Sequence, residues 1–119
     1  MRHTYFIDID GTIFEHAGTL QEMELIGKNL PPIRSSIQKI SEMKHHDHKV
    51  ILTTARPESM RKTTEELLNS NGVVYDLLIM GLPCGPRHVL NDKKPNGDLT
   101  AFAHNYKRDI GFGDLEIPQ

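Results

Sequence analysis

Tyr5-Phe6-Ile7-Asp8-Ile9-Asp10-Gly11-Thr12 is the stretch that decides the fold. Residues 5–9 are mostly apolar and begin with an aromatic pair, which is typical of a strand buried on both faces in a parallel sheet. Gly11 then lets the backbone turn sharply, directly after two carboxylates. The stretch therefore predicts a strand that ends in a pair of acidic side chains.

The rest of the chain alternates between helical and strand patterns. Helical spacing predicts one helix over residues 33–43 and a second from Pro57 to Asn71-Gly72. Apolar runs predict further strands over residues 50–53, 77–80 and 88–90. Residues 99–103 fit an edge strand or a helical turn, and the strand is favoured. The alternation predicts an α/β fold of the three-layer Rossmann-like type, a parallel sheet flanked by helices. Residues 13–30 lack a sustained period and predict an irregular excursion, and the tail from Lys107 is expected on the surface.

Length and composition limit the classes of protein to which the chain can belong. Its 119 residues suit a single domain, 1–119. A formal net charge of −2 with 25% charged residues gives no broad basic face for a nucleic-acid backbone. A single cysteine, Cys84, forms no zinc pattern or internal disulfide and suits a reducing cytoplasm. No apolar run is long enough for a membrane span.

Polar side chains follow three of the predicted strands at the point where each strand ends. In open parallel sheets, ligands bind beyond the carboxyl ends of the strands. We therefore expect these side chains to converge on one crevice: Asp8, Asp10, Thr54, Arg56, Asn91 and Asp92.

The carboxylates in this group predict a magnesium site. Asp8 and Asp10 would repel each other in one crevice, and a cation would offset that repulsion. Asp92 would add a third carboxylate, and an oxygen-rich set of this kind suits Mg²⁺, which also takes a phosphate oxygen from substrate. Asp8 could then attack phosphorus, and Asp10 could protonate the leaving oxygen and later activate water.

The neighbouring groups are candidate phosphate ligands. Thr54 offers a hydroxyl donor, and Gly11 and Thr12 offer backbone N–H groups. Each part also has a plainer interpretation. Asp-x-Asp-Gly by itself can be a turn with a capping aspartate, although a calcium loop is excluded because Thr19 stands where such a loop needs glutamate. The histidines of residues 45–48 can be read as a metal site or, more simply, as a solvated loop.

These residues resemble the haloacid dehalogenase superfamily of phosphohydrolases. The first motif of that superfamily, Asp-x-Asp-x-Thr, is complete at residues 8–12, and the second, a strand ending in Thr or Ser, matches residues 50–54. The fourth, an acidic pair after a strand, is matched by Asn91-Asp92 with Asn in the first place. The resemblance covers roughly residues 3–95. It implies a Rossmann-like sheet, Mg²⁺, Asp8 as the nucleophile and Asp10 as the acid/base.

The chain departs from the superfamily at the third motif. Many relatives place a lysine in the turn where this chain has Leu82. Arg87, just before the fourth predicted strand, is the candidate replacement, with Lys93 and Lys94 behind it; the alternative is that Arg87 is an ordinary solvated arginine. Arg56, beside the second motif, is a further candidate phosphate ligand.

The spacing of the motifs leaves no room for a cap domain. Residues 13–30 would form only a flap over the site. Either the substrate is large, or a neighbouring subunit of a homo-oligomer supplies the missing wall.

The sequence therefore predicts a capless, Mg²⁺-dependent phosphatase acting on a phosphate monoester, either a small molecule or an exposed phosphate on a larger one. Two alternatives stay open. One is a regulatory or assembly protein of the same fold that binds phosphate or metal and turns over poorly. The other is a phosphatase acting on polynucleotide ends, against which the balanced charge argues mildly.

Overall fold

A computed structural model describes residues 1–119, apart from the side chain of Lys28. Every helix of this description is too short or too polar to cross a membrane. The elements follow one another as β1 (Thr4–Asp8), α1 (Leu20–Ile26), the 3₁₀ helix η1 (Gly27–Asn29), α2 (Arg34–His45), β2 (Lys49–Thr53), the 3₁₀ helix η2 (Glu58–Met60), α3 (Arg61–Ser70) and β3 (Leu77–Ile79).

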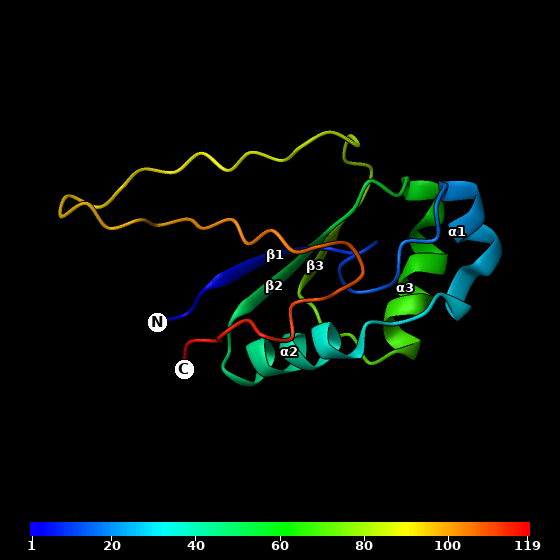
Figure 1. Ribbon diagram of the computed structural model, residues 1–119, viewed down its shortest axis with the longest axis horizontal. Coiled ribbons are helices and arrows are strands. Elements are labelled where there is room, and N and C mark those ends of the chain that lie inside the picture. The colour runs from blue at the N-terminus through cyan, green and yellow to red at the C-terminus, as the bar shows by residue number, and fades with distance from the viewer.

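The three strands form one parallel sheet in the order β1-β2-β3. This confirms the parallel sheet predicted from the alternating pattern and its first three strands. Both crossovers step across the sheet in the same direction, and right-handed crossovers of that kind place their helices on the same face. Accordingly, α2 and α3 lie on one side of the sheet (Figure 1).

The hydrophobic core fills the space between the sheet and these helices. Alternate strand residues point into it, and the helices add their apolar faces: Ile7, Val50, Leu52 and Leu78 from the strands, Ile37, Ile40 and Met43 from α2, and Leu67 and Leu68 from α3. The opposite side of the sheet has no covering helix among the described elements, so the expected third layer is absent. We call this side the open face; its apolar side chains are Phe6, Ile51, Leu77 and Ile79.

The predicted strands over residues 88–90 and 99–103 are wrong. No helix or strand follows β3 within the described chain. Residues 88–105 instead form a long, narrow arm that runs away from the body (Figure 1). Every residue of the arm is exposed except Ala101, which is half-buried. An apolar run becomes a strand only where another strand pairs with it, and here its one ladder contact is the bridge between Lys93 and Leu99.

The flap is more regular than predicted, because it contains the helix α1. The Thr19 side chain accepts a hydrogen bond from the Glu22 backbone N–H at 3.1 Å, and the Glu22 side chain lies 3.3 Å from the Thr19 hydroxyl. Thr-x-x-Glu is the sequence signature of a helix start. Met23, on the inner face of α1, is buried in the core. The flap is thus anchored to the body.

The C-terminal tail does not lie wholly on the surface as predicted. Phe112 and Ile117 are buried members of the core. Near the end of the tail, the buried His48 ring accepts a hydrogen bond from the His3 backbone N–H at 2.9 Å and pairs through Nε2 with the Pro118 carbonyl oxygen. His48 therefore joins the two ends of the chain, and the described residues contain no cluster suited to a metal ion around it.

Candidate active site

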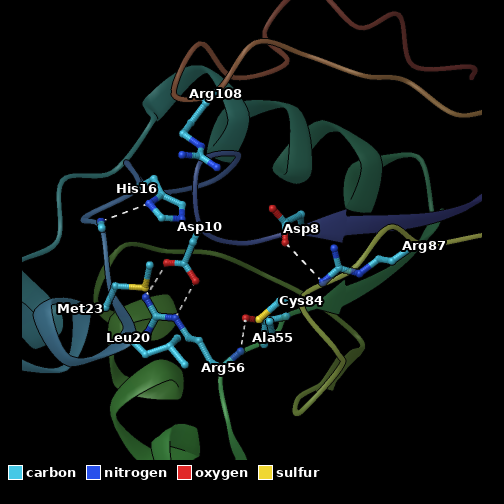
Figure 2. Close-up of a pocket in the computed structure, with 12 residues that line it drawn as sticks. Asp8, Asp10, His16, Leu20, Met23, Ala55, Arg56, Cys84, Arg87 and Arg108 are labelled. Atoms are coloured by element: carbon cyan, nitrogen blue, oxygen red, sulfur yellow. Dashed lines mark hydrogen bonds and ion pairs between the residues drawn. The ribbon is translucent and has the colours of Figure 1, made fainter.

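The ends of β1 and β2 bring together the polar residues of the first and second motifs (Figure 2). Asp8 is the last residue of β1 and pairs in register with Thr53, the last residue of β2. Thr54 follows directly after β2, and Asp10 stands two residues after the end of β1. Together they line a cavity of about 340 Å³. The structure thus assembles two of the three strand ends that the sequence predicted to converge.

Arg56 also lines the cavity, but its guanidinium group is bound to Asp10. Its Nε donates to Asp10 Oδ2 at 2.9 Å and its Nη2 to Asp10 Oδ1 at 2.7 Å. A third donor, Nη1, reaches the buried hydroxyl of Thr64 on α3 at 3.1 Å. Only 1% of the Arg56 side chain is exposed. This two-pronged geometry fixes both the position and the orientation of the Asp10 carboxylate.

The predicted role of Arg56 as a phosphate ligand therefore has no support in this geometry. All three guanidinium nitrogens donate to protein oxygens, and the side chain lies beneath Asp10. One clue to the pairing was local, because Asp10 stands two residues beyond the end of β1 and Arg56 stands three residues beyond the end of β2. The pairing itself connects residues far apart in the chain and depends on the β1–β2 register.

Asp8 is the more accessible of the two carboxylates, with 41% of its side chain exposed. The Thr12 hydroxyl donates to its Oδ2 at 3.4 Å, and Arg87 Nη2 lies 3.8 Å from its Oδ1. Burial raises the pKa of Asp8, and the Asp10 charge adds to that effect, while Arg87 acts in the opposite direction. The Asp8 carboxylate is thus exposed to the cavity, and a nearby positive charge stabilises its ionised form.

The predicted phosphate donors differ in availability. Thr54 is buried at the cavity wall, and its hydroxyl oxygen accepts from the Arg56 backbone N–H at 3.1 Å, which leaves its own hydrogen to donate. The backbone N–H groups of Gly11 and Thr12 donate instead to the carbonyls of Phe14 and Ile9. The expectation that these two N–H groups are free is wrong, because the sharp turn after β1 uses them to close on itself.

Two further side chains of the cavity wall are not among the predicted metal and phosphate ligands. Arg108 points into the cavity from the segment after the arm, and His16 lies on the flap (Figure 2). This segment is fixed in place: the Asp109 backbone N–H donates to the Gly11 carbonyl at 2.8 Å, and the Asp109 carboxylate accepts from the His16 backbone N–H at 2.8 Å. Gly11 also provides the room, since a Cβ there would lie 3.1 Å from Arg108 Cγ. No local pattern marks Arg108 in the sequence.

Arg87, the predicted replacement at the third motif, lines the cavity beside Asp8, and its role as a phosphate ligand stays a prediction. Lys93 and Lys94 lie at the turn of the arm, where the Lys94 backbone N–H donates to the Asp98 carbonyl. Asp92 is exposed on the arm, and its carbonyl accepts from the Thr100 hydroxyl. Asp92, Lys93 and Lys94 all lie outside the cavity lining. The predicted third carboxylate therefore does not join Asp8 and Asp10 within this protomer.

The residues at this site suit an Mg²⁺ ion that is held by one protein carboxylate better than an ion enclosed by three. No group of three or more potential ligands gathers in the described part of the chain. The Asp10 charge is balanced by Arg56, whereas Asp8 keeps an exposed carboxylate whose pKa is raised. Mg²⁺ keeps several waters and requires only one or two protein carboxylates when a phosphate oxygen completes its shell. Asp8 suits that role.

Comparison with known proteins supports the fold. A structural-genomics target from Vibrio cholerae has a TM-score of 0.53 at 21% identity, over 76% of this chain and 79% of that one. A D,D-heptose 1,7-bisphosphate phosphatase from B. bronchiseptica, solved with magnesium and phosphate, has a TM-score of 0.45 at 19% identity, over 71% of this chain and 51% of that one. No protein-family profile and no curated protein sequence matches the chain.

Proposed function

We propose that the protein is a Mg²⁺-dependent phosphatase that hydrolyses a phosphate monoester through an aspartyl-phosphate on Asp8. The observation that carries this proposal is the difference in exposure and pairing between two carboxylates at one strand end. Asp8 is accessible and faces a cationic cavity, whereas Asp10 is held rigidly beside it by Arg56. The complete Asp-x-Asp-x-Thr motif at residues 8–12 agrees with this difference.

The chain's own residues can perform both halves of the reaction. An Asp8 oxygen attacks phosphorus, the bond from phosphorus to the ester oxygen breaks, and Asp10 gives that oxygen a proton. Asp10 then takes a proton from water, the resulting hydroxide attacks phosphorus, and the bond to Asp8 breaks to release inorganic phosphate. Bound Mg²⁺, held at Asp8, would neutralise charge on the phosphate. Arg56 keeps Asp10 in one orientation through both steps.

The cavity wall can hold the phosphate oxygens. Arg87 and Arg108 bring positive charge from two sides, and Thr54 offers its hydroxyl. Charge-assisted hydrogen bonds of this kind are about twice as strong as neutral ones, and they grow stronger as negative charge develops in the transition state. The proposed phosphate ligands are therefore Thr54, Arg87 and Arg108. The Thr12 hydroxyl orients Asp8.

The test is Mg²⁺-dependent phosphate release from an aryl phosphate. Asp8→Asn should abolish the release, because the amide cannot act as the nucleophile. Asp47→Asn is the matched control: Asp47 is exposed and makes its ion pair with Arg2, outside the cavity, so its variant should keep the wild-type rate. Equal rates in the Asp8 variant and the wild type would sink the mechanism.

The second candidate is a regulatory or assembly protein that binds phosphate or metal without substantial turnover. The absence of Asp92 from the cavity favours it, because the protomer alone supplies fewer metal ligands than predicted. A panel of sugar phosphates, nucleotides and oligonucleotides with terminal phosphates separates the candidates and the substrate classes. Turnover of any member supports the phosphatase. Magnesium-dependent binding of inorganic phosphate, measured by calorimetry, with no turnover of the whole panel would support the second candidate.

A further inference from the structure

The open face and the arm are two apolar surfaces of one chain, and both leave large apolar side chains exposed in the protomer. On the open face, Phe6 is 62% exposed. On the arm, Leu90 is 88% exposed, although it is a large aliphatic side chain. Scattered exposed apolar residues are ordinary, but contiguous apolar patches on a folded chain mark interaction sites.

The open face is contiguous because of the strand register. Phe6 lies opposite Ile51 on the neighbouring strand, and Ile51 lies opposite Leu77 on the next. Side chains paired in this way touch one another across a sheet, so the three form a row from one edge to the other. Ile79, two residues beyond Leu77 on the same face, extends the row toward the carboxyl ends of the strands. The face is a short apolar strip.

The arm is a two-sided ribbon, and the few contacts between its two sides are too weak to stabilise it. Its two sides meet at the Lys93–Leu99 bridge and at hydrogen bonds between Thr100 and residues 91–92. A lone two-stranded ribbon is marginally stable at best in water. Its large apolar side chains, Val89, Leu90, Leu99 and Phe102, are all exposed. Burial of these side chains against another surface would stabilise the arm.

We propose that two copies of the chain exchange arms, each arm packing on the open face of the other copy. Both surfaces are apolar and both belong to the same chain. The open face has no covering helix among the described elements, and the large apolar side chains of the arm have no surface in the protomer on which to pack. In the protomer the arm runs apart from the sheet and projects beyond the two chain ends (Figure 1). A two-fold pair satisfies both surfaces at once, and such exchange of identical elements is a low-cost route to a dimer. The proposal rests on the fold alone and is independent of the proposed activity.

The experiment uses two variants with complementary defects. The face variant carries Phe6→Lys and Leu77→Lys, and the arm variant carries Leu90→Glu and Phe102→Glu. All four positions are exposed in the protomer, so folding of the single chain is spared. Leu25→Lys and Leu25→Glu are the matched controls, since Leu25 on α1 is 81% exposed and outside both surfaces. Molar mass is measured for the full chains by light scattering and by sedimentation over a range of concentrations.

The exchange model predicts a distinct result for each sample. The wild type and the Leu25 controls should be dimers. For each double variant alone, the dissociation constant of the dimer should be at least about tenfold higher. Mixing the two variants should restore dimers, because the intact arm of the face variant meets the intact face of the arm variant.

Three results would overturn the proposal. A monomeric wild type would show that the arm closes on its own sheet or stays free. An arm variant that stays as dimeric as the wild type would show that the open faces pair without the arms. Two dissociated variants that stay monomeric on mixing would exclude exchange. If a double variant is unfolded by circular dichroism, Phe6→Lys and Leu90→Glu are mixed as single variants with the same expected outcomes.

Discussion

Arg56 holds both carboxylate oxygens of Asp10, at 2.7 and 2.9 Å, from a position that is almost fully buried. The pair joins the ends of β1 and β2, and the Thr64 hydroxyl ties it to α3. It holds the Asp10 side chain, which moves protons in the proposed reaction, in a constant orientation. Asp8, beside it, keeps its exposure and its raised pKa. In the proposed reaction, Asp10 would therefore be a rigid acid/base group and Asp8 an accessible nucleophile.

Replacing Arg56 with methionine should destabilise the protein strongly. The change leaves the Asp10 carboxylate, only 12% exposed, without its partner, and breaking one side of a buried ion pair costs about 3–5 kcal/mol. Asp10→Asn in the same chain should recover part of that loss, because the stranded charge is then removed. Urea unfolding of the wild type, both single variants and the double variant measures the coupling. Strictly additive losses would contradict a direct pair.

Asp8→Asn should stabilise the fold at neutral pH. The folded pKa of Asp8 is raised above its ordinary value of 3.8, chiefly by burial. Between the unfolded and folded pKa values the native state binds more protons, so the stability of the wild type falls as pH rises through this window. The asparagine variant has no carboxyl group at this position, so its stability does not fall in this way as the pH rises. Its melting temperature in EDTA should exceed that of the wild type at pH 7, and the gap should narrow at pH 3.

Asp47→Asn is the control for this experiment, because Asp47 is exposed and its pair with Arg2 lies at the surface. A melting temperature of Asp8→Asn below that of the wild type at pH 7 would show that Asp8 is held by stronger partners than Arg87 and Thr12. The gain in stability and the loss of activity should occur together, as is common where a site is built on unfavourable charge.

Arg87 and Arg108 should differ in their kinetic effects. Arg87 lies 3.8 Å from Asp8, where charge develops on the transferred group, so Arg87→Ala should lower kcat about 100-fold. Arg108 lines the cavity, and no ion pair of its guanidinium is found in the described part of the chain. Arg108→Ala should mainly raise KM. Steady-state rates over a range of substrate concentrations separate the two effects, and a reversed pattern would exchange the two roles.

The first half of the fold was predictable because its signals are local. The apolar run before Asp8, the helical spacing of residues 33–43 and the stop at Asn71-Gly72 each specify an element without help from distant residues. The convergence of Asp8, Asp10 and Thr54 followed from one further rule, that parallel strands share a carboxyl edge. The Thr19-x-x-Glu22 signal was also present, but the lack of a longer period in the flap hid it.

The errors concern features that depend on distant partners. Residues 88–90 have a strand-like pattern, yet strand formation needs a neighbour with which to pair, and local sequence does not specify one. The same reason explains Asp92, which was placed at the site only through that strand. Arg56 was expected among the phosphate ligands because it stands with Thr54 at the end of the second predicted strand. Its pairing with Asp10 depends on the alignment of two strands about 45 residues apart in the chain.

Gly111 should tolerate alanine much less well than Gly97. Both have positive φ, 83° and 92°, so alanine costs about 1–2 kcal/mol at either position through the backbone alone. At Gly111 a Cβ would also lie 2.6 Å from Ile33 Cγ2 and 2.7 Å from Ser36 Oγ, whereas at Gly97 it would meet open space. The clash should add about 1–3 kcal/mol, because the tail would have to move away from the start of α2. Chemical unfolding of the two variants measures the difference, and equal losses would show that the tail docks too loosely to hold Phe112 in the core.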